Sequence, residues 1–243
     1  MKKILMTLTV IFACGQLMAQ DSTEAKKKDW SKIDLSHRAA DHFMIQFGID
    51  NWAGAPDSIK LKGLSRSANV YFMFDFPFKT DPRFSVGIGA GIGTSNIYFD
   101  RMIVDLKDVG NKLPFRNVAD TNNFKKYKLT TAFLEAPVEL RYALNPEDMD
   151  KSWKFALGVK VGTMLNAHTK GKTLRSKDGQ TINPYTVKES TKRFFNSTRF
   201  SGTVRIGYGN LSLFGSYQIN PLIKEGYGAE IRPYIIGITL SGL

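Results

Sequence analysis

Residues 131–142, TAFLEAPVELRY, alternate strictly between two kinds of side chain. The intervening positions carry charge in the middle of the segment, at Glu135, Glu139 and Arg141. The other set is apolar throughout and consists of Ala132, Leu134, Ala136, Val138, Leu140 and Tyr142. A period of two places these sets on opposite faces of a β-strand. A soluble sandwich would bury the apolar face, whereas a membrane barrel turns that face to lipid and keeps polar side chains in its lumen.

The same alternation recurs along the chain and predicts eight strands, at residues 42–50, 67–78, 83–99, 127–144, 153–168, 193–208, 211–219 and 233–242. Four alternating phenylalanines in the second range are difficult to pack in a sandwich core, but lipid accepts them without complementary packing. One face of the third range is built of glycine, at Gly87, Gly89, Gly91 and Gly93. Glycines at this period suit the crowded interior of a small barrel, where they leave room for long side chains across the lumen.

The connections between the predicted strands alternate between long and short. Residues 51–66, 100–126, 169–192 and 220–232 are predicted to be long loops, whereas Gly209 and Asn210 make a two-residue hairpin turn. Outer-membrane barrels have short periplasmic turns and long outer loops. We therefore predict an all-β, eight-stranded antiparallel up-and-down transmembrane β-barrel with both termini in the periplasm. A soluble lipocalin-like barrel, with its apolar face inward, is the alternative.

An eight-stranded barrel is just wide enough for its own side chains to fill. The inward set supplies acids and bases, namely Asp75, Glu135, Glu139, Arg141, Lys160, Arg199 and Arg205. Unpaired charge in such an interior is costly, so we expect salt-bridged clusters that plug the lumen, with an ion path as the alternative.

The predicted lipid-facing residues include Phe72, Phe74, Phe76, Leu134, Val138, Leu140, Tyr234, Ile236 and Ile238. Aromatic residues near strand ends, Trp52 among them, are expected at the bilayer interfaces.

Residues 1–19 are typical of a secretory signal peptide, because two lysines precede a short apolar run and a small residue, Ala19, ends it. A lipoprotein signal cleaved before Cys14 is the rival interpretation. Residues 20–41 are predicted to be a flexible periplasmic leader, or else a docking tail for a periplasmic partner, and residues 42–243 the barrel domain. Cleavage after Ala19 would leave no cysteine, so the fold would rest on a closed sheet instead of disulfides.

The chain of 243 residues has a formal net charge of +12. An exported protein rarely meets nucleic acid, so anionic outer-membrane lipid is the expected counter-charge. The basic residues of the predicted loop 169–192 could contact lipopolysaccharide phosphates; a merely solvated loop is the alternative.

We expect no cofactor, no metal site and no enzymatic activity. Of the histidines His37, His42 and His168, only His168 is expected at the outer rim, without an evident serine or acid partner.

FLEAPVELRY at residues 133–142 resembles the hallmark segment of the PorT-like outer-membrane β-barrel family of Bacteroidetes-type bacteria. The Ala19-Gln20 junction, the glycine-alternating third strand and the final RPYIIGITLSGL are similar to the same family. The resemblance spans the whole barrel and implies this fold, together with a role as an accessory subunit in type IX protein secretion or envelope assembly. A structural or interaction role for the barrel alone, and a narrow channel, are the other functions that we consider. The sequence names no cargo, partner or oligomeric state.

Overall fold

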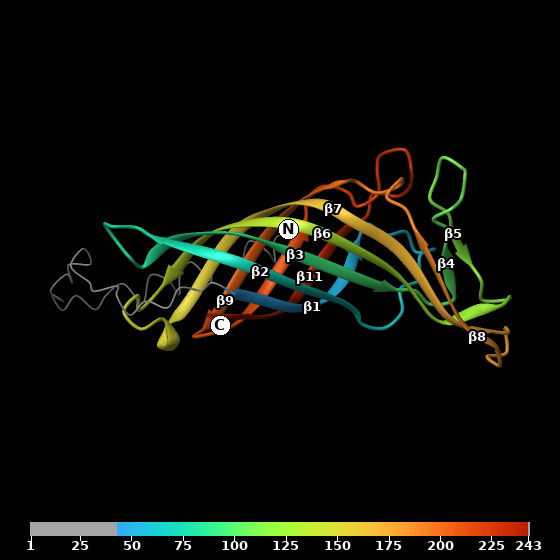
Figure 1. Ribbon diagram of the computed structural model, residues 1–243, viewed down its shortest axis with the longest axis horizontal. Coiled ribbons are helices and arrows are strands. Elements are labelled where there is room, and N and C mark those ends of the chain that lie inside the picture. Colours follow the sequence, from blue (N-terminus) through green and yellow to red (C-terminus); the bar gives the residue numbers. More distant parts are fainter. Residues whose placement is uncertain (1–42, 243) are drawn as a thin grey trace, which may run out of the picture.

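The computed structural model describes residues 43–242. The predicted signal peptide and leader (1–41), with Cys14 and His37, lie outside this part of the chain, as do His42 and Leu243. Within it the regular secondary structure is β-strand apart from one turn of 3₁₀ helix (Figure 1). The barrel strands are β1 (Phe43–Ala53), β2 (Ser65–Pro77), β3 (Phe84–Tyr98), β6 (Asn123–Ala143), β7 (Trp153–Arg175), β9 (Thr198–Tyr208), β10 (Leu211–Gln218) and β11 (Arg232–Ser241).

Each barrel strand pairs antiparallel with its neighbours along the chain, and one further pairing, between β1 and β11, closes the sheet. The order runs β6-β3-β2-β1-β11-β10-β9-β7, and β6 also pairs with β7. The first and last strands meet through β1 and β11, with Ile45 opposite Leu240. Closure pairs the backbone amides and carbonyls on both edges of every strand, which a spanning sheet in lipid requires. The predicted eight-stranded up-and-down barrel is confirmed.

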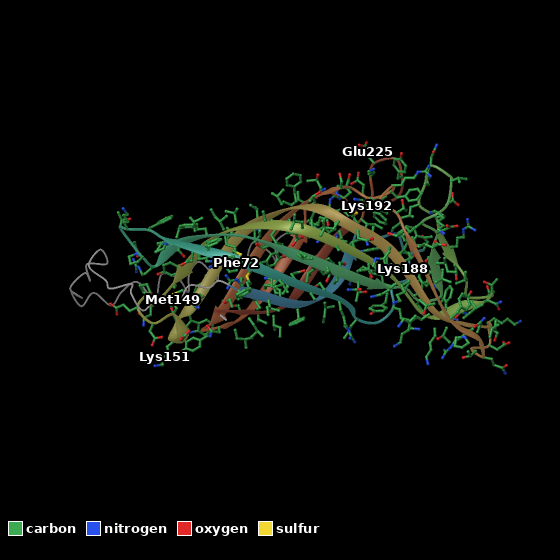
Figure 2. The ribbon with its side chains drawn as sticks, in the orientation of Figure 1. Phe72, Met149, Lys151, Lys188, Lys192 and Glu225 are labelled. Carbon is green, nitrogen blue, oxygen red and sulfur yellow. The ribbon has the colours of Figure 1, made fainter. Side chains whose placement is uncertain are left out.

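The strands turn their apolar face outward and their polar face inward, which is the reverse of the arrangement in a soluble barrel. Phe74 on β2 is 49% exposed and Ile236 on β11 is 63% exposed, whereas Glu135 on β6 is 1% exposed. Phe72, which is 40% exposed, lies on the barrel wall away from both ends (Figure 2). An apolar exterior around a charged interior excludes the lipocalin-like alternative.

Exposed apolar side chains, Phe74, Val138 and Ile236 among them, form a band on the wall that we call the apolar belt. Beyond this belt, at the end where the long connections lie, the structure contains strands that the sequence patterns did not predict. β4 (Met102–Val104) and β5 (Phe115–Asn117) form a hairpin, and β8 (Thr181–Ser190) pairs with an extended β7. The predictions of a loop throughout 100–126 and throughout 169–192 were therefore wrong. β8 is exposed on both faces, so its side chains show no alternation of apolar and polar positions, although its backbone still pairs.

An apolar core fills the barrel at this same end. Phe194 and Phe195 leave the wall and enter it, so the predicted strand 193–208 begins only at Thr198. Trp52 is 6% exposed and packs edge-on against Phe99, so its expected place at a bilayer interface was wrong. The buried members are Trp52, Ile97, Phe99, Met102, Val104, Leu106, Leu113, Tyr127, Leu129, Phe133, Met164, Ala167, Phe194, Phe195, Leu222, Ile223 and Ile231. We call this set the apolar cap.

The opposite end of the barrel carries the short connections, including one turn of 3₁₀ helix, η2 (Met149–Lys151). Figure 2 shows Met149 and Lys151 at this end and Lys188, Lys192 and Glu225 at the other. In residues 43–242, no helix is long and apolar enough to cross a membrane.

A charge placed on the exterior of the belt tests the orientation of the wall. Val138→Arg is expected to lower the free energy of unfolding in lipid vesicles by about 2–4 kcal/mol, because arginine is costly against acyl chains near the midplane. Ile182→Arg is the matched control, since Ile182 is exposed on β8 outside the belt; its effect is expected within about 0.5 kcal/mol. Denaturant titration followed by tryptophan fluorescence measures both. Equal effects of the two substitutions would contradict the orientation.

Candidate functional site

Glu135 is the centre of a charged cluster inside the barrel. Its carboxylate lies 3.0 Å from Arg199 Nη1 and 3.6 Å from Lys160 Nζ. The Tyr71 hydroxyl donates to Glu135 Oε2 at 2.5 Å, and Lys160 Nζ donates to the Tyr71 oxygen at 3.2 Å. β2, β6, β7 and β9 each contribute one of these side chains, so the cluster ties strands on different sides of the barrel together.

Glu139 is the centre of a second charged cluster. It lies four residues from Glu135 along β6, nearer the short turns. Its Oε2 accepts from Arg205 Nη2 at 2.8 Å and from Arg141 Nε at 3.0 Å. Arg141 also reaches Asp75 Oδ1 with its Nη1, at 3.5 Å. The structure thus places all seven predicted lumen residues inside the barrel and brings acids and bases together as ion pairs.

Glycines on the neighbouring strands make the space for these side chains. In the register, Glu135 lies between Gly91 on β3 and Gly162 on β7, and Glu139 lies between Gly87 and Gly158. A Cβ atom at Gly87 would lie 2.5 Å from Arg141 Nε. At Gly93, two residues beyond Gly91 on β3, it would lie 2.7 Å from Glu135 Oε2. The alternating glycines of the third strand therefore serve the side chains that cross the lumen, as the pattern indicated.

Sequence reasoning left out three partners of the cluster. Asp50 on β1 is 2% exposed and accepts from the Ser95 hydroxyl, and it adds a fourth carboxylate to the predicted set. Tyr71 bridges Glu135 and Lys160, and Gln218 Oε1 accepts from Arg199 Nε at 3.1 Å. All three lie on the polar phase of their strands, so the alternation contained the signal. The predicted set contained only charged residues near the strand centres, and it therefore omitted these three.

The lumen beside the cluster holds little free space. Two hollows, one beside Lys160 and Arg199 and one beside Arg141 and Arg205, measure about 10 Å³ each, no more than a single water needs. Toward the long connections, Phe133 stacks against the Arg199 guanidinium, whose carbon lies 3.9 Å from the ring centre. Phe133 also belongs to the apolar cap, so ion pairs and apolar packing fill the interior in succession along its axis.

The nine residues predicted to face lipid lie on the outside of the wall. Eight of them are between 40% and 63% exposed, and Tyr234 is half-buried near Ile236 in the sequence. Its ring borders an apolar groove of about 660 Å³ in the exterior wall, over β7, β9, β10 and β11.

His168 lies on β7 beyond the apolar belt. There β6 and β7 continue and β8 pairs with β7, and we call this part of the wall the extension. In the part of the chain that the structure describes, its Nδ1 has no hydrogen-bond partner. Burial, with Lys188, Lys128 and Lys170 close by, lowers its pKa. Ser190 is opposite His168 in the β-ladder, but its hydroxyl bonds to Asn166 Oδ1 at 3.0 Å and to the Ala167 carbonyl at 3.1 Å. Among residues 43–242, no group of three or more His, Cys, Asp or Glu could hold a metal ion.

The closed sheet, apolar exterior and charged interior define the class of this protein as an eight-stranded transmembrane β-barrel. Residues 19–224 match the family model described as outer membrane protein beta-barrel domain. The chain belongs to that family, and it is an outer-membrane protein.

Two similar solved structures are both of Ail, the attachment invasion locus protein of Yersinia pestis. One is 12% identical over 82% of this chain and 95% of that chain, with a TM-score of 0.35. The other, Ail in complex with the heparin analogue sucrose octasulfate, has the same identity and coverage and a TM-score of 0.34. No curated protein matches the sequence significantly.

Removal of the Glu135 carboxylate tests the energetic role of the cluster. Glu135→Ala is expected to lower the free energy of unfolding by about 3–5 kcal/mol, since it leaves two buried cations without their shared partner. Glu225→Ala is the control, because Glu225 is exposed at the long-connection end; its effect is expected within about 0.5 kcal/mol. Denaturant titration of the refolded barrel in vesicles measures both. A loss no larger than that of the control would show that the ion pairs contribute nothing net.

Proposed function

We propose that this protein is an integral outer-membrane barrel with a side-chain-filled lumen, which works through its extracellular extension and not by transport. The observation that carries the proposal is the continuous filling of the interior. Glu135 and Glu139 hold the ion pairs at its centre, and the apolar cap closes the end with the long connections.

The extension offers the surface for a structural or interaction role. β7 runs to Arg175 and β8 folds back along it, so the basic segment predicted as a loop is a hairpin. A paired hairpin presents its side chains in a fixed arrangement, which favours contact with a partner over simple solvation. The partners that we propose are outer-membrane lipid and lipopolysaccharide, with no nucleic acid, no cofactor and no catalytic role.

Conductance tests the filled lumen. The full chain, inserted into planar lipid bilayers, is expected to give no unitary current steps, because ions would have to cross paired charges and the apolar cap. A general porin added to the same bilayers provides the positive control. If unitary current steps appear and their ion selectivity changes in the Glu135→Gln variant, the current passes through this lumen. That result would contradict the proposal.

A second candidate is an accessory subunit of a type IX secretion or envelope assembly machine, as the PorT-like resemblance implies. Its support is the FLEAPVELRY segment, but in the structure this segment supplies Glu135, Glu139 and Arg141 to the lumen. The matching residues therefore serve the fold that such barrels share and bear little on a secretion role.

Co-purification from native outer membranes separates the two candidates. After chemical cross-linking, an accessory subunit is expected to retain envelope secretion proteins in stoichiometric amounts. The interaction barrel that we favour is expected to retain lipopolysaccharide without such proteins. Stoichiometric recovery of a secretion complex would establish the second candidate in place of the first.

A further inference from the structure

Five lysines lie side by side on the outward face of the extension. The β-ladders place Lys128 on β6 opposite Lys170 on β7, and Lys170 opposite Lys188 on β8. One row further out, Lys126 lies opposite Lys172. We call these five residues the lysine ladder; they come from three strands that meet only in the folded chain.

The ladder is electrostatically unfavourable in the protein alone. Residues directly opposite each other have Cβ atoms about 4.5–5.5 Å apart, and like charges at that separation destabilise the pairing. Within residues 43–242, none of the five ammonium groups has a carboxylate oxygen within 4.0 Å. Burial, with Lys170 and Lys172 nearby, lowers the pKa of Lys128. An anion held among these lysines would relieve the repulsion.

The lysines surround a hollow with an aromatic wall. Tyr98 lines a space of about 210 Å³ together with four of the lysines, namely Lys126, Lys128, Lys170 and Lys172. Lys128 Nζ lies 6.0 Å from the Tyr98 ring centre and donates to Asn96 Oδ1 at 2.6 Å, which fixes the position of the ammonium group. The hollow is far larger than the space one water needs.

A second hollow continues from the first. Tyr98 and Lys126 also line a neighbouring space of about 430 Å³, into which Lys125, Arg66 and Arg175 bring further positive charge. Two adjoining basic hollows suit a ligand with more than one anionic group.

The height of the ladder on the wall indicates the source of the anion. Lys128 lies six residues beyond Leu134, the last exposed large apolar residue of β6 in this direction. At about 3.4 Å per residue and a tilt of about 40°, this distance is about 15 Å along the membrane normal. A phospholipid headgroup layer is only about 5–7 Å thick per leaflet. The ladder therefore stands at the level of a saccharide layer above the bilayer.

We propose that the lysine ladder and Tyr98 form a binding site for the phosphate groups of a phosphorylated outer-leaflet glycolipid of the lipopolysaccharide type. Ammonium groups bind phosphate through charge-assisted hydrogen bonds, and the tyrosine ring packs against the saccharide that carries it. The site faces outward from the wall, so the ligand reaches it laterally from the membrane. This inference rests on the proposed function, because it requires the barrel to sit in the outer membrane with its extension outside.

The test compares two variants of the full chain in phosphatidylcholine nanodiscs that contain lipopolysaccharide. Lys128→Gln, Lys170→Gln and Lys172→Gln are combined in the first. Lys107→Gln, Lys112→Gln and Lys177→Gln are combined in the second, which removes the same charge from exposed positions outside the ladder. The measurements are the amount of lipopolysaccharide that co-purifies with the barrel, the apparent Kd and its dependence on salt.

The ladder variant is expected to bind about tenfold or more weakly than wild type and with a shallower salt dependence, since even one lost charge-assisted hydrogen bond accounts for that factor. The control variant should change by less than about twofold. Wild type should bind enzymatically dephosphorylated lipopolysaccharide as weakly as the ladder variant binds the intact form. Millimolar inorganic phosphate should not displace the glycolipid.

Three results would overturn the site: unchanged binding by the ladder variant, an equal loss in the control variant, or undiminished binding of the dephosphorylated form. Displacement by inorganic phosphate would make it a site for free phosphate and would equally contradict the inference. The ladder variant is expected to fold at least as well as wild type, because it removes repulsion. Heat-modifiable electrophoretic migration checks that both variants are folded barrels, so failure of the site is distinguishable from failure of the barrel.

Discussion

The ion pairs around Glu135 and Glu139 are the constraint on which the rest of the barrel depends. Eight strands fix a lumen that is too narrow for water-filled space but wide enough for long side chains. Charges enclosed there must be paired, because an isolated buried charge is far costlier than a pair. The glycines beside each glutamate in the register provide the room, and the cations come from strands across the barrel. Packing and electrostatics thus specify the same register.

A single strand in this molecule passes through two surroundings. The outward face of β6 is apolar from Tyr142 to Leu134 and then carries Thr130, Lys128 and Lys126. The inward face changes in the opposite sense, from Arg141 and Glu135 to Leu129 and Tyr127. The belt has a polar lumen and an apolar exterior, whereas the extension has the apolar cap inside and charge outside. The change of polarity along both faces marks where lipid gives way to water.

This inversion bears directly on function. A lumen filled by ion pairs and closed by the cap leaves the exterior of the extension as the surface available to partners. The hairpin of β7 and β8 holds that exterior in a fixed geometry, and the lysine ladder is its most concentrated charge. A repulsive arrangement of this kind lowers stability when unoccupied, and the anionic ligand that we propose would relieve the repulsion.

The sequence by itself determined the barrel, its orientation and most of its charged interior, because a period-two pattern in lipid leaves little freedom. Phe74 must face outward and Glu135 inward, and the glycines of β3 follow from the same alternation. It did not determine the extension, where β8 shows no apolar alternation and where β4 and β5 are only three residues long each, too short for a period of two to be recognised. The cap places Trp52, Phe194 and Leu222 together through contacts between segments far apart in the chain. The lysine ladder likewise exists only through register: Lys128, Lys170 and Lys188 are unremarkable in the sequence, and the pairing of β6, β7 and β8 makes them neighbours.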